Sequence, residues 1–188
     1  MISSIFVNKL DPSDLQKVIE VSDWLGIDAN WLCAVIYFET GKTMRPDTKN
    51  KIGSVGLIQF TRDKKGVEYK TIQGKRYLLN DLALMTFKEQ MEIVRLYFAP
   101  FKNRMKNFLD VYLVVFFPVA LNKPDDYVLQ TSSLSASIIA KQNPIFDRNK
   151  DLQITRLEVT SYFSKWFGTA FSDIEAKKKC CCCNQTIN

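Results

Sequence analysis

The sequence predicts an all-α fold, a single helical domain over residues 1–176 followed by a flexible, basic, cysteine-rich tail over 177–188. Its 188 residues are enough for one domain with its own core but too few for two of ordinary size. Hydrophobic residues make up 46% of the chain, and Gly and Pro number only 7 and 6, which excludes disordered and fibrous proteins. Apolar residues recur at helical spacing behind helix-capping residues along most of the chain.

Two helices are predicted near the N-terminus. Asp11 followed by Pro12 is a typical helix start, because the aspartate caps free backbone N–H groups and proline's missing N–H is harmless at the first position. A second helix is expected to begin after Asp28 and to stop at Gly41. Its apolar face carries Leu32, Val35 and Ile36.

The next segment, residues 43–75, loses helical periodicity and collects Gly, Lys, Asn and Asp, so it is expected to be mainly loop. An extended stretch at its end, Tyr69 to Leu79, turns at Gln73-Gly74. This stretch predicts a short β-hairpin or a mobile flap.

Thr86 and Glu89 form a capping box for a further helix, which Pro100 is expected to end. The following segment, FLDVYLVVFFPVAL over residues 108–121, is apolar all round. Its β-branched and aromatic residues favour a strand on propensity alone. Because helices are predicted on both sides, a central buried helix is the preferred interpretation.

Two more helices complete the fold. One is predicted over Thr131 to Lys141, stopped by Asn143-Pro144. The last is capped by Thr155. It has an apolar stripe at helical spacing, formed by Val159, Tyr162, Phe163, Trp166, Phe167 and Ala170.

The composition excludes several kinds of chemistry. The chain has no His, so a Ser/His/Asp triad, a Cys/His dyad and a histidine-ligated metal site are all excluded. Any catalysis therefore runs on carboxylates, Lys, Tyr or Cys. The net charge of +6 suits an anionic polymer, but such attraction is unspecific. Nucleic acid is not an expected partner, since the chain lacks a basic helix or interleaved basic and aromatic residues.

The five cysteines do not form a disulfide framework. Cys33 lies alone in an apolar stretch and is expected to be a small core residue. The other four, Cys180 to Cys183, are consecutive and follow three lysines, so palmitoylation, crosslinking and plain disorder are open readings of the tail, with disorder preferred. No signal peptide and no transmembrane segment are recognised, and synthesis in the cytoplasm is expected.

Glu39 is the strongest candidate for a catalytic residue. It follows Leu32, Val35 and Ile36 at spacings that place its carboxylate on the apolar face of the second helix. It also lies in the last turn, at the negative end of the helix dipole. Both effects raise the pKa of a glutamate, which can then act as a general acid near neutral pH. The alternative is a glutamate at the rim of the core or paired with Lys or Arg.

The segment GSVGLIQF, residues 53–60, follows the second helix, and we call it the glycine loop. Its composition suggests a sugar site. Gly53 and Gly56 allow the backbone to turn tightly or to approach a ligand. Gln59 both donates and accepts hydrogen bonds, and it is set among Leu57, Ile58 and Phe60. Apolar surface beside a polar amide suits a carbohydrate ring.

WLCAVIYFETG followed by GSVGLIQF resembles the helix-end glutamate and Gly-Leu-x-Gln loop of lytic transglycosylase and goose-type lysozyme domains. LYFAPF, VYLVVFFPVALNKPDDYVL and QNPIFDRNKDLQITRLEV resemble phage-type and bacterial members more loosely. The resemblance implies an α-helical lysozyme-like fold that cleaves the β-1,4 bond between N-acetylmuramic acid and N-acetylglucosamine. Peptidoglycan strands would be its substrate, and no cofactor would be needed for the chemistry.

The resemblance also implies the site residues. The catalytic acid falls on Glu39, and the loop glutamine, which contacts substrate or orients the site, falls on Gln59. Gly56 and Phe60 would lie beside it at the substrate. No motif fixes a second carboxylate. Three acidic residues near the loop remain candidates by sequence proximity alone: Asp63, Glu68 and Asp81.

The chain departs from the family pattern at two substrate positions. Asn50 stands where many relatives have a serine upstream of the glycine loop, and it is still able to hydrogen-bond. Phe117 stands where relatives often have a tyrosine, so a hydroxyl that would face the glutamate or the sugar is missing. Three tyrosines are candidates to replace it: Tyr37, Tyr112 and Tyr127.

The functional expectation is therefore a muramidase or lytic transglycosylase. The alternative is a catalytically inactive glycan-binding or structural component of a phage or secretion apparatus. Without a signal peptide, the chain is expected to reach the bacterial wall through a phage or contact-dependent delivery system. An inhibitor or immunity partner would fit that setting.

A calcium loop is predicted near the C-terminus. Residues at positions 1, 3, 5, 7, 9 and 12 of an EF-hand-like loop carry oxygen ligands: Asp147, Asn149, Asp151, Gln153, Thr155 and Glu158. Position 6 is usually Gly, but here it is Leu152, which would have to accept a strained backbone. Thr155 and Glu158 also form a capping box that needs no metal. A structural calcium ion is the expectation.

Overall fold

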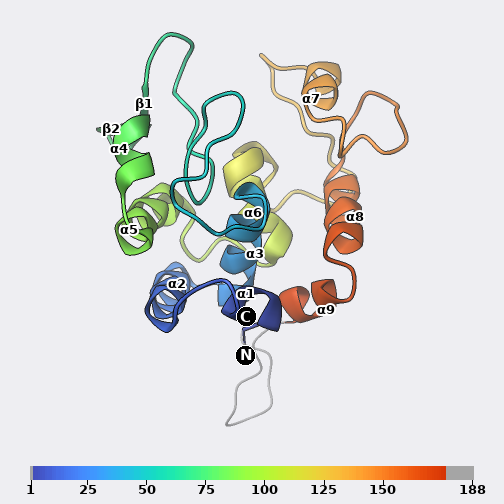
Figure 1. Ribbon diagram of the computed structural model, residues 1–188. Coiled ribbons are helices and arrows are strands. Elements are labelled where there is room, and N and C mark those ends of the chain that lie inside the picture. Colours follow the sequence, from blue (N-terminus) through green and yellow to red (C-terminus); the bar gives the residue numbers. More distant parts are fainter. Residues whose placement is uncertain (1, 177–188) are drawn as a thin grey trace.

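The computed structural model describes residues 2–176. The chain is mostly α-helical, with one short antiparallel hairpin (Figure 1). The predicted tail, residues 177–188, lies outside the described residues. The helices are α1 (Ser4–Val7), α2 (Pro12–Leu25), α3 (Ala29–Glu39), α4 (Leu79–Leu84), α5 (Phe87–Phe98), α6 (Phe108–Phe116), α7 (Ala136–Gln142), α8 (Arg156–Phe167) and α9 (Ala170–Glu175).

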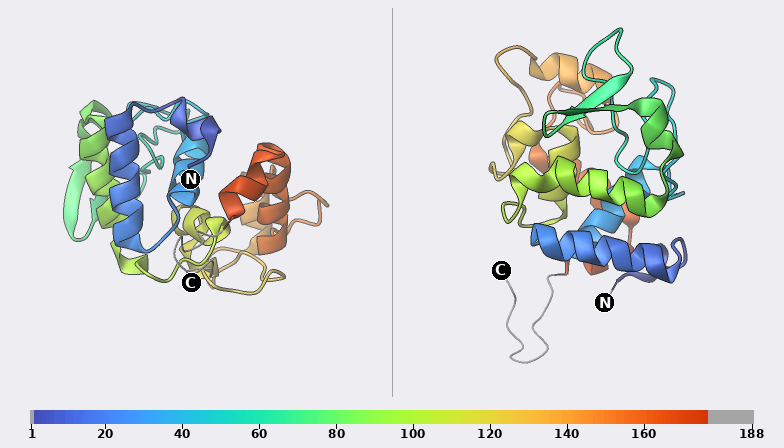
Figure 2. Two further views of the ribbon diagram at one scale, coloured as in Figure 1. Left: turned by 90° about the horizontal axis from the view of Figure 1, so that it is seen from below. Right: turned by 90° about the vertical axis from the view of Figure 1, so that its left-hand side faces the viewer.

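Helix α3 occupies the centre of the molecule. It contacts α2 on one side and α6 and α9 on the other (Figure 1). Helices α2 and α5 run side by side across one face, as the right-hand view of Figure 2 shows. The aspartate side chain of Asp28 caps α3 by accepting a hydrogen bond of 2.8 Å from the backbone N–H of Asn30. Every residue from Ala29 to Ile36 is buried, so the helix is surrounded by protein over its first two turns.

The predicted helix starts are confirmed at most positions. Asp11 caps α2 through the N–H groups of Ser13 and Asp14. The capping boxes are present at Thr86, ahead of α5, and at Thr155, ahead of α8. In each case the side chain satisfies a backbone donor that the first helical turn leaves free.

The apolar segment 108–121 forms a helix, α6, rather than a strand. Asn107 accepts a hydrogen bond from the N–H of Asp110 and starts the helix, which ends at Phe116, two residues before Pro118. A short 3-10 turn, Pro118–Ala120, follows. Burial on all sides therefore outweighs the strand propensity of its β-branched residues.

The hairpin is also confirmed. Strand β1 (Tyr69–Ile72) pairs antiparallel with β2 (Lys75–Leu78), with Ile72 opposite Lys75. The turn lies at Gln73 and Gly74, which both have positive φ, 49° and 77°. Two positive φ values in a two-residue loop match the twist of the flanking strands.

Two predicted helix boundaries are wrong. The helix predicted from Thr131 begins at Ala136, because the Thr131 hydroxyl accepts a hydrogen bond from the N–H of Leu134 and closes a turn instead. The final helix is interrupted at Gly168, whose φ is 58°. Ala170 therefore belongs to a separate helix, α9, and not to the stripe of α8.

One continuous core joins these elements. Phe163 of α8 lies within aromatic contact of Phe38 on α3 and of Phe108 and Tyr112 on α6, with ring centroids 4.6–4.9 Å apart. At the start of α8, Arg156 makes a buried ion pair of 3.1 Å with Asp110 of α6. Apolar contacts thus join α3, α6 and α8, and an ion pair adds to the contact between α6 and α8.

Within residues 2–176, none of the helices has the length and apolar character needed to cross a bilayer. Cys33 is fully buried on α3 and forms no disulfide, as expected for a small core residue.

Candidate active site

Glu39 is the last residue of the central helix α3. Its neighbours on the preceding turn, Val35 and Ile36, are completely buried, whereas Glu39 keeps part of its surface accessible. Among the described residues, no side chain forms an ion pair or hydrogen bond with its carboxylate. Glu39 is therefore an unpaired acid at the boundary of the core.

Burial raises the pKa of Glu39 from 4.5 to about 8. The cause is desolvation, because the charged carboxylate loses water and gains no cation or hydrogen-bond donor in exchange. At neutral pH the side chain therefore holds its proton. A protonated carboxyl group at an accessible boundary is able to donate that proton to a bound ligand.

Two tyrosines lie close enough to Glu39 to feel its charge. Tyr97 of α5 and Tyr112 of α6 are both largely buried, and desolvation is the main cause of their raised pKa. The negative charge of Glu39 raises the pKa of both further. Both phenols therefore remain protonated, and the Tyr97 hydroxyl donates a hydrogen bond of 3.5 Å to the carbonyl of Val114. The sequence analysis predicted Tyr112 as a candidate to replace the hydroxyl missing at Phe117, but it did not predict Tyr97.

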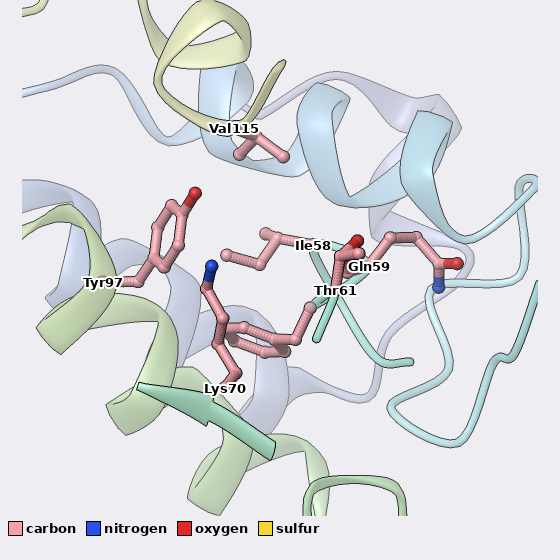
Figure 3. Close-up of a pocket in the computed structure, with 7 residues that line it drawn as sticks. Ile58, Gln59, Thr61, Lys70, Tyr97 and Val115 are labelled. Carbon is pink, nitrogen blue, oxygen red and sulfur yellow. The ribbon is translucent and has the colours of Figure 1, made fainter. Parts of the chain in front are cut away.

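A cavity of about 110 Å³ lies beside Tyr97, and Glu39 is not among the residues that line it (Figure 3). Tyr97 connects the two, since it lines the cavity and also responds to the charge of Glu39. The lining residues come from the glycine loop, the hairpin and helices α5 and α6: Ile58, Gln59, Phe60, Thr61, Lys70, Tyr97 and Val115.

Lys70 supplies a cation to the cavity. It reaches from strand β1 toward Tyr97 and Ile58 (Figure 3). Its ammonium lies 3.4 Å from a carboxylate oxygen of Asp63. Apolar walls together with a phenol, an ammonium group and a hydroxyl are suited to a polar ligand with apolar faces, such as a sugar.

Hydrogen bonds with the side chain of Gln90 on α5 hold the glycine loop in place. The amide oxygen of Gln90 accepts a hydrogen bond of 2.5 Å from the N–H of Leu57, and its amide N–H groups donate to the carbonyls of Pro46 and Leu82. Gly56 lies directly on this amide, so a Cβ at that position would collide with Gln90. Gly56 is buried and serves close packing of the loop, and it does not line the cavity.

Gln59 is held by the loop itself. Its φ is 51°, and its amide N–H groups donate to the carbonyls of Thr48 at 3.2 Å and Gly56 at 3.0 Å. In Figure 3 the amide points away from Lys70 and Tyr97. Gln59 thus lines the cavity while its amide nitrogen stabilises the loop.

The other substrate residues expected from the sequence are spread over the region. Phe60 is buried and lines the cavity, with its ring centroid 6.0 Å from that of Tyr97. Asn50 does not line the cavity, and its side chain accepts hydrogen bonds from the N–H groups of Ile52 and Ser54 within its own turn. Phe117 is buried just after α6 and lies outside the cavity lining.

The candidates for a second carboxylate have other partners or none. Asp63 accepts a hydrogen bond from the N–H of Thr71 and pairs with Lys70, and the contact with Thr71 is the main reason that its pKa is lowered. Glu68 pairs with Arg62 at 2.8 Å. Asp81 is exposed on α4. Desolvation is the cause of the Glu39 shift, and none of these acids adds to it.

Sequence reasoning missed Thr61 because a loop gives no period from which to place a side chain. It missed Lys70 because the approach of strand β1 to the cavity depends on how the hairpin packs. Tyr97 could have been found, since it lies in the segment LYFAPF that carries part of the family resemblance.

Comparison of the chain with protein-family models, with curated proteins and with solved structures finds no match. The case for an activity therefore rests on the residues and their geometry.

Proposed function

We propose that the chain is an enzyme that cleaves the β-1,4 bond between N-acetylmuramic acid and N-acetylglucosamine in peptidoglycan, with Glu39 as general acid and base. The observation that carries the proposal is the unpaired carboxyl group of Glu39, whose pKa of about 8 keeps it protonated at neutral pH and whose charge acts on Tyr97, a residue that lines the cavity. The family resemblance of the sequence around Glu39 and the glycine loop supplies the substrate class.

In the proposed reaction, Glu39 gives its proton to the glycosidic oxygen, and the bond from that oxygen to the anomeric carbon breaks. The sugar then passes through an oxocarbenium-like state. Either water or the muramyl 6-hydroxyl adds to the anomeric carbon and returns its proton to the Glu39 carboxylate. The first route is hydrolysis, and the second gives a 1,6-anhydro sugar.

Other site residues support the proposal. The absence of a described carboxylate acting on Glu39 suits a mechanism with one central acid, in which the substrate's own N-acetyl group assists. Tyr97 and Tyr112 have hydroxyls near that acid, and either could replace the hydroxyl that Phe117 lacks. We further propose that the chain acts at the bacterial wall after delivery by a phage or secretion apparatus.

The test is digestion of purified peptidoglycan by the wild-type chain and by Glu39→Gln, with soluble fragments identified by mass spectrometry. Removing the proton donor should lower the rate about 100- to 10,000-fold, the usual contribution of a general acid. Fragments with anhydro ends would define a lytic transglycosylase, and fragments one water heavier would define a muramidase.

Glu175→Gln is the matched control, because Glu175 is also a glutamate whose pKa is raised mainly by burial. It lies on α9 and should leave the rate unchanged. The enzyme proposal fails if the wild-type chain releases no fragments, and glycan binding without cleavage would favour the inactive binding component instead.

A further inference from the structure

The loop between α7 and α8 and the first turn of α8 contain two buried oxygen atoms for which the described residues provide no partner. They are Oδ1 of Asp147 and Oε1 of Glu158, the first and twelfth residues of the EF-hand-like pattern. An unpaired carboxylate oxygen removed from water is destabilising unless a donor or a cation reaches it. The two atoms occur at the two positions where such a loop places its strongest calcium ligands.

The second oxygen of each carboxylate is already bound, which fixes how the side chains lie. Oδ2 of Asp147 accepts a hydrogen bond of 3.2 Å from the N–H of Leu152. Oε2 of Glu158 accepts from the N–H and hydroxyl of Thr155, both at 2.9 Å. The capping box thus uses one oxygen of Glu158 and leaves the other for a ligand. Helix capping alone does not account for the buried Oε1.

The backbone has the turn that the pattern requires even though glycine is missing. Leu152, at position 6, has a φ of 65° and directs its side chain to solvent, where 45% of the residue is exposed. The neighbouring Ile154, at position 8, is completely buried, and its carbonyl accepts a hydrogen bond of 2.8 Å from the N–H of Leu129. The loop is therefore anchored to the core on one side.

We propose that residues 147–158 bind one Ca²⁺ ion. The ligands would be the free oxygens of Asp147 and Glu158, the side chains of Asn149 and Asp151 and the backbone carbonyl of Gln153. An all-oxygen set of this kind suits a hard cation that accepts six to eight ligands, and it does not suit zinc.

Binding requires one rearrangement. Within residues 2–176, no group of three acidic, cysteine or histidine side chains converges as a metal site would need. Asp151 is exposed, and its carboxylate accepts hydrogen bonds from the Asn149 amide at 3.0 Å and the Gln153 N–H at 2.9 Å. It must turn inward. The flanking Arg148 and Lys150 are both exposed and do not occupy the site.

The test is titration of the full chain, first stripped with a chelator, with CaCl₂ in a calorimeter and in thermal melts. We expect one equivalent of Ca²⁺ to bind, a higher melting temperature, and a much weaker response to MgCl₂. Asp151→Asn, at an exposed position, and Glu158→Gln, which keeps the capping box, should each lower the calcium affinity at least about 10-fold.

Asp126→Asn is the matched control, because it removes an equal charge from an exposed carboxylate on the preceding loop. It should bind Ca²⁺ like the wild-type chain. No heat and no change in melting temperature with the wild type would overturn the proposal, and so would unchanged affinity in Asp151→Asn and Glu158→Gln. The outcome is independent of glycan cleavage, since Glu39 takes no part in it.

Discussion

At the scale of single residues, the environment of Glu39 differs from that of every other acid near the glycine loop. Asp63 and Glu68 have cationic or N–H partners and lie toward solvent. Glu39 has neither kind of partner and is partly withdrawn from water at the end of a buried helix. Within one region the pKa of the Glu39 carboxyl is thus raised while that of the Asp63 carboxyl is lowered, as a division between the proposed acid catalyst and a structural ion pair requires.

The pH dependence of the reaction follows from this difference. Because the proton donor is lost as the pH rises through the folded-state pKa of about 8, the cleavage rate should be constant below about pH 7 on account of Glu39 and fall about tenfold per pH unit above about 9. Initial rates of fragment release between pH 6 and 10 test this. Glu175→Gln should have the same profile, and a wild-type rate that stays flat to pH 10 would contradict the assignment.

At the scale of elements, the glycine loop owes its shape to a helix far away in the sequence. The side-chain amide of Gln90 on α5 donates hydrogen bonds to the carbonyls of Pro46 and Leu82 and accepts one from the N–H of Leu57. Through these three contacts, one buried amide joins the loop to α4 and α5. Gly56 permits the contact because it has no side chain.

Gly56→Ala should therefore unfold more easily for two reasons. The new Cβ would collide with Gln90, and alanine would have to accept a φ of 86°. Gly66→Ala separates the two effects, because Gly66 has a φ of 85° but open space around it. We expect Gly56→Ala to lose about 1–3 kcal/mol more than Gly66→Ala in urea unfolding, as overpacking does. Equal losses of unfolding free energy in the two variants would mean that the Gln90 side chain moves aside without destabilising the fold.

Elements with local signals could be predicted, and those that depend on distant contacts could not. Asp11, Asp28, Thr86 and Thr155 cap their helices as the sequence indicates, since capping involves residues only two or three apart. The helix expected from Thr131 starts late because a threonine side chain closes a competing turn.

The same distinction applies to the candidate site: its locally determined residue could be predicted, and the residues that depend on distant packing could not. Glu39 could be placed because helical periodicity fixes its face. The approach of Lys70 and Tyr97 to one cavity depends on how the hairpin and α5 pack, which no local spacing encodes.

At the scale of the whole molecule, the ion pair of Arg156 with Asp110 joins α8 to α6. Its side chains are 5% and 2% exposed, and Arg156 also donates a hydrogen bond of 2.6 Å to the carbonyl of Ala120. Removing one member of such a pair leaves a buried charge uncompensated, whereas replacing both is often tolerated.

Arg156→Met should accordingly lower the free energy of unfolding by about 3–5 kcal/mol, measured by urea denaturation. The double variant Asp110→Asn, Arg156→Met should recover part of the loss. Arg62→Met is the control, because it breaks an ion pair with the exposed Glu68 and should cost less than about 1 kcal/mol. A loss in Arg156→Met no larger than in Arg62→Met would mean that water reaches Asp110.

The thiol of Cys33 can report how often the packing around the central helix α3 opens. Its thiol is completely buried, and burial raises its pKa to about 12, so almost none of it is the reactive thiolate in neutral solution. An alkylating reagent can modify it only in molecules whose core has transiently separated. Because Cys33 and Glu39 share one helix, the modification rate, read on the peptide that contains Cys33, measures how often Glu39, the proposed acid, loses the packing that keeps it protonated.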